Sequence, residues 1–297
     1  MPQIIPTFAD IAPRYRAVFC DLWGCLHNGR EAYPAAVAAL QAYRAGGGKV
    51  LLLTNSPRPK SSVVNQLDGF NVPRDCYDEV ASSGDAAQYA LLTGAVGRRV
   101  YHIGPDKDLS FFNDIAPDIG PIAATETPIT RVPLAEAEGI VVTGPFDDRK
   151  DLPEDYRATF LLAKTKGLKL LCANPDVVVD LGETRLYCAG ALAQLYDQMG
   201  GESLYFGKPH PPIYDLARRR LSALTGATPD DEILCIGDGI DTDIAGGMAE
   251  GLDTLFITAG LAATEFGADA ANPDAAMLAA WAKAQRAIPT YAMGYLR

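Results

Sequence analysis

The sequence predicts an α/β fold built on a parallel sheet, and three observations point to it. Short apolar runs that fit buried strands alternate with helical patterns along the 297 residues. One such run, residues 17–22, carries Asp21 near its end. Another, residues 233–236, is followed by Gly237 and Asp238. Because ligands of open parallel sheets bind at the carboxyl ends of the strands, we expect a functional site at these carboxylates.

The composition limits the classes of function. With 48% hydrophobic residues the chain can bury a substantial core, and a net charge of −11 argues against general affinity for nucleic acid. No window has the apolar length of a membrane span, and residues 1–16 lack the signature of a secretory signal. The scattered cysteines have no zinc-finger or CxxC spacing, so we expect reduced thiols and a cytoplasmic location. They are Cys20, Cys25, Cys76, Cys172, Cys188 and Cys235.

The elements of the predicted sheet and its helices follow in order along the chain. A proline at position 34 suits the first turn of a helix, and the glycines at 46–48 end it. Expected strands are residues 17–22, 49–53, 79–81, 203–206, 233–236 and 254–257. Expected helices are residues 34–44, 59–67, 189–199, 211–224 and 241–250, with another that follows residues 82–84 and ends at residue 92 and a closing helix after Asp274.

A second α/β pattern interrupts the first. Residues 99–103, 139–142 and 169–172 are expected strands, residues 153–166 an expected helix, and residues 121–133 a proline-rich surface connection. We therefore predict a discontinuous core domain of residues 1–83 and 189–297 and an inserted domain of residues 84–188.

Four short motifs carry residue types suited to phosphate chemistry, although each also has an ordinary structural explanation. Asp21 precedes a glycine-containing turn that lets backbone amides approach an anion, or it caps that turn. Thr54, Asn55 and Ser56 offer hydroxyls and amides for phosphate, or begin the next helix. Lys208 provides a point charge for phosphate, or is a solvated loop lysine.

The fourth motif, residues 237–243, combines glycines with three carboxylates. Asp241 can be explained as a helix cap, whereas Asp238 closes a strand and is not explained by capping. A cluster of hard oxygen donors favours Mg²⁺, so Asp21 and Asp238 are the expected metal ligands.

The order of these motifs resembles that of the haloacid dehalogenase (HAD) superfamily. The segments LLLTNSPR (51–58), ASSGDAAQYAL (81–91), ANPDVVVD (173–180) and GKPHPPIYDLA (207–217) are similar to its subclass IIA, which includes sugar phosphatases and 4-nitrophenylphosphatases. The resemblance covers nearly the whole chain. It implies a Rossmann-like core with an inserted class II cap domain, in which Asp21 is the nucleophile, Thr54 and Lys208 hold phosphate, and Asp243 supports the metal site or Lys208.

One position departs from the family pattern. HAD phosphatases usually carry Asp-x-Asp, in which the second Asp protonates the leaving group and activates water, but here that position is Trp23. Trp has no proton of suitable acidity, although its backbone carbonyl can still ligate a metal. His27 lies close in sequence and is a candidate replacement, with a structural or substrate-facing role as the alternative.

We therefore predict a Mg²⁺-dependent phosphomonoesterase that forms an aspartyl-phosphate and acts on a small phosphorylated metabolite, either a sugar-phosphate-like compound or an aryl phosphate. The alternative is a catalytically impaired homologue that only binds a phosphate ligand. Carbon–halogen hydrolysis needs no metal, so the acidic cluster argues against it. We expect no nucleic-acid or membrane partner. The sequence leaves open whether the chain forms a homodimer. Candidate substrate contacts are His27, Arg58, Asn174, Asp176 and Arg185.

Overall fold

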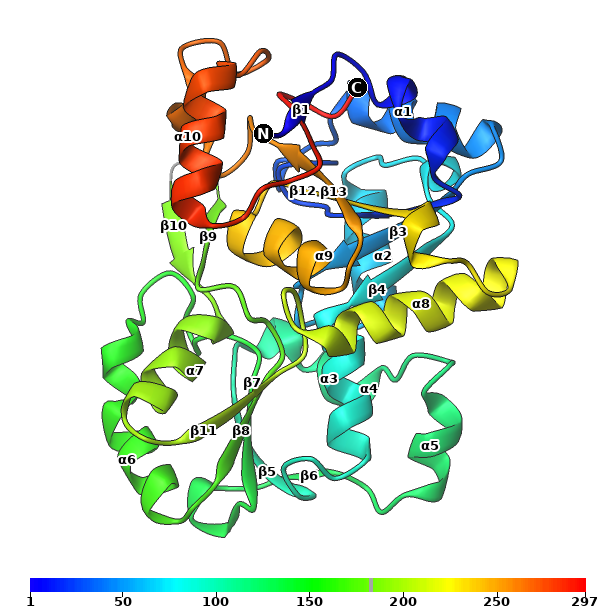
Figure 1. The fold of residues 1–297 in the computed structure, drawn as a ribbon. Helices are drawn as coiled ribbons and strands as arrows, with labels where there is room; N and C mark the ends of the chain where they lie inside the picture. Colours follow the sequence, from blue (N-terminus) through cyan, green and yellow to red (C-terminus); the bar gives the residue numbers. More distant parts are fainter. Residues whose placement is uncertain (182–183) are drawn as a thin grey trace. The chain divides into compact units, whose positions relative to one another are not determined.

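The computed structural model describes residues 1–181 and 184–297 and confirms the predicted α/β class (Figure 1). The chain forms two compact units. The first unit contains Met1–Thr54, Gln66–Ala81 and Tyr214–Arg297, and the second contains Asn55–Asn65 and Ser82–Ile213. The chain passes from one unit to the other at both ends of residues 55–65, after residue 81 and near the start of α8 (Pro211–Thr225).

The first unit is built on a seven-stranded sheet. Its order is β1 (Gln3–Ile4), β14 (Tyr291–Met293), β13 (Asp253–Ile257), β12 (Ile233–Gly237), β2 (Ala17–Cys20), β3 (Lys49–Thr54) and β4 (Glu79–Ser82). From β1 to β3 every neighbouring pair is parallel. Every residue of β2 and β12 is buried, as expected for central strands covered on both faces. The two carboxylates predicted to form a site therefore follow adjacent central strands.

Helices of the first unit begin at residues that favour helix N-termini. They include α1 (Pro34–Ala45), the greater part of α8, α9 (Ala245–Ala249) and α10 (Ala275–Gln285). Pro34 occupies the first turn of α1, and Asp274 caps α10 by accepting hydrogen bonds from the N–H groups of Ala276 and Met277 at 2.9 and 2.8 Å.

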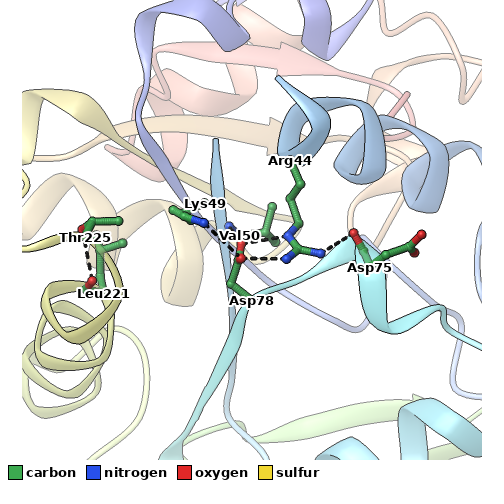
Figure 2. A network of polar contacts seen from close by, with 7 residues as sticks. All are labelled: Arg44, Lys49, Val50, Asp75, Asp78, Leu221 and Thr225. Carbon is green, nitrogen blue, oxygen red and sulfur yellow. Dashed lines mark hydrogen bonds and ion pairs between the residues drawn. The ribbon is translucent and has the colours of Figure 1, made fainter. Parts of the chain in front are cut away.

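A polar network around Asp78 joins the start of β3 to the segment before β4 (Figure 2). The Asp78 carboxylate accepts hydrogen bonds from Arg44 at 2.7 and 2.9 Å and from the Val50 N–H at 2.9 Å. Arg44 also donates to the carbonyl of Asp75, and Lys49 lies 3.5 Å from Asp78. Burial alone would raise the pKa of Asp78, but the hydrogen bonds and these cationic neighbours outweigh it, so the pKa lies below its usual value.

The second unit has its own parallel sheet of five strands. The order is β11 (Glu202–Tyr205), β8 (Lys169–Cys172), β7 (Gly139–Val142), β5 (Arg99–Ile103) and β6 (Thr130–Arg131). Side chains alternate between its faces. Ile140 and Leu170 belong to the core cluster that contains residues of α7 (Ala189–Gln198), while Val141 and Leu171 belong to the cluster that contains residues of α3 (Ser83–Leu92).

The predicted domain boundary at residue 189 differs from the structure. Helix α7 packs against β8 and β11, and β11 pairs in parallel with β8, so residues 189–213 belong to the second unit. The pattern of alternating strands and helices is the same in both sheets, so periodicity could not assign this segment. Pairing partners, which the sequence does not encode locally, decide the assignment.

Several smaller elements were not predicted. The first sheet gains two short strands, β1 at its edge and β14 beside it, and β9 (Val178–Leu181) and β10 (Thr184–Tyr187) form a two-stranded antiparallel sheet. The surface connection at residues 121–133 contains most of α5 (Gly120–Thr125) and all of β6.

The remaining helices are α2 (Lys60–Gly69), α4 (Ser110–Asn113) and α6 (Arg157–Thr165), of which α2 and α6 lie where helices were expected. Among the described residues no helix combines the length and apolar character needed to span a bilayer.

Candidate active site

Asp21 and Asp238 lie together at the carboxyl ends of β2 and β12. The two strands pair in parallel, and the Asp21 N–H donates to the Ile236 carbonyl at 2.8 Å. A carboxylate oxygen of each Asp and the Cys25 sulfur all lie within 4.8 Å of one another. All three side chains are buried, with exposed fractions of 8% or less. The adjacency predicted from the sequence is thus present in the structure.

Two glycines make room for the Asp238 carboxylate. A Cβ on Gly24, which has φ +76°, would lie 2.1 Å from Asp238 Oδ2, and a Cβ on Gly260 would lie 2.0 Å from the same atom. The Leu261 N–H donates to Asp238 Oδ2 at 3.0 Å and fixes its orientation. The carboxylate is therefore held in a cradle that any larger residue at either glycine would fill.

Asp243 supports the turn that follows Asp238. Its Oδ2 accepts a hydrogen bond from the Gly239 N–H at 3.1 Å and a longer one from the Thr242 hydroxyl at 3.4 Å. The expected helix of residues 241–250 begins as a π-helical turn, η8 (Ile240–Ile244), before α9. This wide turn brings the buried Asp243 side chain back over Gly237, where a Cβ would meet it at 2.1 Å. Asp243 thus holds the backbone next to Asp238.

The donor set of this cluster fits a divalent cation. Bonds of about 2.0–2.3 Å to oxygen and sulfur span at most roughly 4.5 Å across an ion, close to the separations found here. The two adjacent carboxylates give the site a strongly negative electrostatic potential. Burial first, and then the charges of Asp238 and Asp21, raise the pKa of the Cys25 thiol well above its usual range. A cation would offset this concentration of negative charge.

Trp23 and His27 pack together beside the cluster. Their rings lie 5.7 Å apart in an edge arrangement, and a Cβ on Gly29 would lie 2.4 Å from the Trp23 ring. The Gly29 N–H donates to His27 Nδ1 at 3.1 Å, so the proton of the neutral ring is on Nε2. Burial lowers the pKa of His27 to about 4. A neutral, 2% exposed imidazole packed against Phe70 at 5.0 Å is a structural residue and a poor proton donor.

Thr54 closes β3, with an exposed fraction of 8%, and Asn55 follows it as the first residue of the second unit. Within that unit Asn55 connects two loops. Its amide nitrogen donates to Asp176 Oδ1 at 2.8 Å and to the Lys208 carbonyl at 3.1 Å, while its oxygen accepts from the Lys208 N–H at 2.7 Å. The side chain of Asn55, predicted to contact phosphate, is thus engaged in positioning the Lys208 loop.

The predicted substrate contacts come from several segments of the chain. Asn174 and Asp176 lie together after β8, where the Asp176 N–H donates to Asn174 Oδ1 at 3.0 Å. Ser56 and Arg58 lie on the loop after Asn55, and the Arg58 N–H approaches the Ser56 hydroxyl at 3.4 Å. Arg185 is exposed on β10.

The sequence analysis did not single out two buried polar groups. Cys25 was assigned only a reduced thiol, although its position four residues after Asp21 is the signal that could have identified it. Asp108 is 4% exposed in the second unit. Burial raises its pKa to about 6, with the charges of Arg58 and Lys107 and a hydrogen bond from Thr143 opposing that rise. A carboxyl group with such a pKa titrates near neutral pH.

A cavity of about 470 Å³ borders the metal-ligand cluster within the first unit. Its lining includes Gly24, Cys25, Tyr33, Asn272 and Tyr295. The cavity therefore reaches Cys25, the sulfur-bearing member of the cluster.

Comparisons with known proteins find related hydrolases. A family model described as haloacid dehalogenase-like hydrolase matches residues 18–116, and a second model, HAD-hydrolase-like, matches residues 205–280. The chain is similar to a crystal structure of a haloacid dehalogenase-like hydrolase from Brucella suis 1330, with 37% identity, a TM-score of 0.83 and full coverage of both chains.

Two curated relatives are more distant. The 5'-nucleotidase YutF of Bacillus subtilis is 25% identical over 84% of this chain and 90% of its own length. The ribonucleotide monophosphatase NagD of Escherichia coli is 24% identical over 84% of this chain and 89% of its own length. The predicted family and enzyme class are thereby confirmed.

Proposed function

Because the chain belongs to the haloacid dehalogenase-like hydrolase family, we propose that it is a Mg²⁺-dependent phosphomonoesterase that acts through an aspartyl-phosphate. The observation that carries the proposal is the buried pair Asp21 and Asp238 at the ends of adjacent parallel strands. Two buried carboxylates this close are costly unless a cation or a reaction requires them.

Asp21 is the nucleophile in this proposal. Its carboxylate oxygen attacks phosphorus, the bond from phosphorus to the leaving oxygen breaks, and water then hydrolyses the aspartyl-phosphate to inorganic phosphate. The hydrogen bond from the Asp21 N–H to Ile236 fixes the backbone of the nucleophile to the neighbouring strand. A nucleophile anchored in this way needs little reorganisation before attack.

Asp21, Asp238 and the Trp23 carbonyl are the proposed ligands of Mg²⁺. When bound, the cation supplies positive charge beside the transferring phosphoryl group. The glycine cradle and the Leu261 N–H keep Asp238 in one orientation, and Asp243 holds the turn that carries it. Supporting contacts of this kind set the affinity of a metal site.

Thr54 and Lys208 are the proposed phosphate-binding residues, with the Ser56 hydroxyl and the backbone amides of the 54–56 segment as further donors. The contacts of Asn55 support a role in positioning, since its side chain bonds to both the N–H and the carbonyl of Lys208. A lysine neutralises phosphate charge as a point cation. We assign residues 84–188 to the cap. Asn174, Asp176 and Arg185 are candidates for substrate contacts within it, and Arg58 is a candidate outside it.

The substrate class proposed here is a small phosphorylated metabolite, namely a sugar phosphate, a nucleoside monophosphate or an aryl phosphate. The names of YutF and NagD favour nucleoside monophosphates. A 24% identical relative from Staphylococcus aureus named acid sugar phosphatase favours sugar phosphates. Trp23 supplies no acid–base proton, and the buried neutral His27 is a poor substitute. The enzyme then depends on the acidity of the leaving group, which favours aryl and acyl phosphates.

The test is phosphate release from a panel of phosphate esters by metal-free protein, with and without added Mg²⁺. The proposal expects turnover that requires Mg²⁺ for at least one ester. Binding of phosphate or its analogues without any turnover would favour the alternative, a phosphate-binding homologue that has lost catalysis.

A further inference from the structure

Cys25 contributes a sulfur atom to a site whose other donors are carboxylates. Its Sγ and the oxygens of Asp21 and Asp238 all lie within 4.8 Å of one another, and Cys25 itself is 1% exposed. Among the described residues this is the one group of three or more His, Cys, Asp and Glu side chains with that spacing. The side chains of this group therefore offer a cation two carboxylate oxygens and one thiol, in addition to the proposed Trp23 carbonyl.

Sulfur changes which cation the site prefers. Mg²⁺ binds oxygen ligands and takes thiols poorly, whereas thiolates select softer ions such as Zn²⁺. Zn²⁺ accepts both thiolate sulfur and carboxylate oxygen, usually in a tetrahedral set with bonds of about 2.0–2.3 Å. The three side chains would fill three positions of that set, and the fourth is left for the Trp23 carbonyl, water or phosphate.

The surroundings hold this donor set in place. The backbone N–H of Gly24, the residue before Cys25, donates to the His27 carbonyl at 2.9 Å, which closes the turn between them. Gly24 also lies against the Asp238 carboxylate, where a Cβ would approach Oδ2 to 2.1 Å. The turn that carries the sulfur is thus packed directly on the carboxylate that shares the ion.

We propose that Cys25 is a third metal ligand and that the site binds Zn²⁺ through Asp21, Cys25 and Asp238 more tightly than it binds Mg²⁺. This inference rests on the metal site of the proposed function and extends it. Binding replaces the S–H bond of Cys25 by a bond to the metal, and the proton passes to the buffer. Because both ions need Asp21 and Asp238, Zn²⁺ and Mg²⁺ exclude each other, and Zn²⁺ controls how much enzyme is available to Mg²⁺.

The test uses metal-free protein titrated with Cd²⁺ alone, a thiophilic probe whose bond to sulfur produces an ultraviolet charge-transfer band. The wild type is expected to show the band with one equivalent of Cd²⁺ and to lose it when Zn²⁺ or excess Mg²⁺ is added. Cys25→Ser is expected to lack the band. Its Cd²⁺ affinity should fall by at least the roughly 10–100-fold that loss of an indirect supporting contact costs.

Cys76→Ala is the matched control, because Cys76 is also a buried thiol of the first unit but lies outside the cluster. It should keep both the band and the affinity. An unchanged band and Cd²⁺ affinity in Cys25→Ser would overturn the proposal, as would a band that excess Mg²⁺ does not affect.

A second measurement does not depend on a variant that folds. X-ray absorption by the wild-type protein loaded with one equivalent of Zn²⁺ should show one sulfur at about 2.3 Å with the remaining ligands oxygen. A shell of oxygen alone refutes the assignment. Phosphate release with Mg²⁺ is measured in parallel. Turnover without a metal–sulfur bond would support the proposed function and refute the role of Cys25 as a ligand. A metal–sulfur bond without turnover would support Cys25 as a ligand and refute the proposed function.

Discussion

Replacing Gly24 by alanine should damage the metal site by a defined route. Gly24 has φ +76°, a backbone conformation that costs a non-glycine residue roughly 1–2 kcal/mol. The added Cβ would also lie 2.1 Å from Asp238 Oδ2, whereas ordinary contact begins near 3.4 Å. The Asp238 carboxylate must therefore move by about 1 Å, well beyond the roughly 0.5 Å tolerance of a working site.

A misplacement of this size can cost about 10²-fold in rate, so we expect Gly24→Ala to lower kcat/KM by that order and to weaken Mg²⁺ binding. Steady-state phosphate release over a range of Mg²⁺ concentrations measures both effects. Urea unfolding measures the accompanying loss of stability.

Gly47→Ala is a control that separates the steric clash with Asp238 from the energetic cost of positive φ. Gly47 has φ +97°, but an added Cβ would meet no atom within 4 Å. The control should lose comparable stability and keep wild-type activity and Mg²⁺ dependence. The reasoning fails if Gly24→Ala retains wild-type Mg²⁺ affinity and rate, or if Gly47→Ala impairs them equally.

Three further predictions concern single side chains. Asp238→Ala should weaken Mg²⁺ binding and activity together, with partial rescue by excess Mg²⁺ in steady-state assays; a variant with normal Mg²⁺ dependence would contradict its role as a ligand. The wild type should hydrolyse aryl phosphates far faster than alkyl phosphates, and Trp23→Asp should raise alkyl turnover toward the lower end of the roughly 10²–10⁴-fold range of acid–base catalysis. Comparable wild-type rates on both classes, unaffected by His27→Ala, would show that another group delivers the proton. Asp78→Asn should cost about 2 kcal/mol at neutral pH, within the range for hydrogen bonds to a charged group, because the ion pair with the 25% exposed Arg44 side chain is only partly buried. Because the folded-state pKa of Asp78 lies below the unfolded value near 4, the difference between wild type and variant in urea unfolding should shrink as pH falls below about 4, and a pH-independent difference would refute this account.

The sequence predicted most of the sheet because buried strands and amphipathic helices carry strong local patterns. The strands at residues 99–103, 139–142 and 169–172 form where they were expected, as β5, β7 and β8. The short strands β1 and β14 were missed, since two or three residues carry no recognisable period and depend on a neighbouring strand for their conformation.

The sequence predicted those site residues whose positions follow from the order of the strands. Asp21 and Asp238 follow strands that the sequence identified, and the parallel pairing of β2 with β12 brings them together. Contacts that depend on loop geometry were not foreseen. The Asn55 side chain binds the Lys208 loop, and His27 is buried and neutral, because both depend on packing partners distant in sequence. The approach of the Cys25 sulfur to Asp21 and Asp238 likewise depends on the geometry of the loop after β2.

The formation of a phosphoryl-enzyme on Asp21 tests the central claim most directly. Wild-type protein is mixed with a rapidly cleaved aryl phosphate and Mg²⁺, quenched in acid within one turnover, and analysed by peptide mass spectrometry. The account predicts the mass of one added phosphoryl group on the peptide that contains Asp21, and neither this adduct nor turnover in a folded Asp21→Asn variant. Wild-type turnover by Asp21→Asn, or a phosphoryl group found on a different residue, would contradict it.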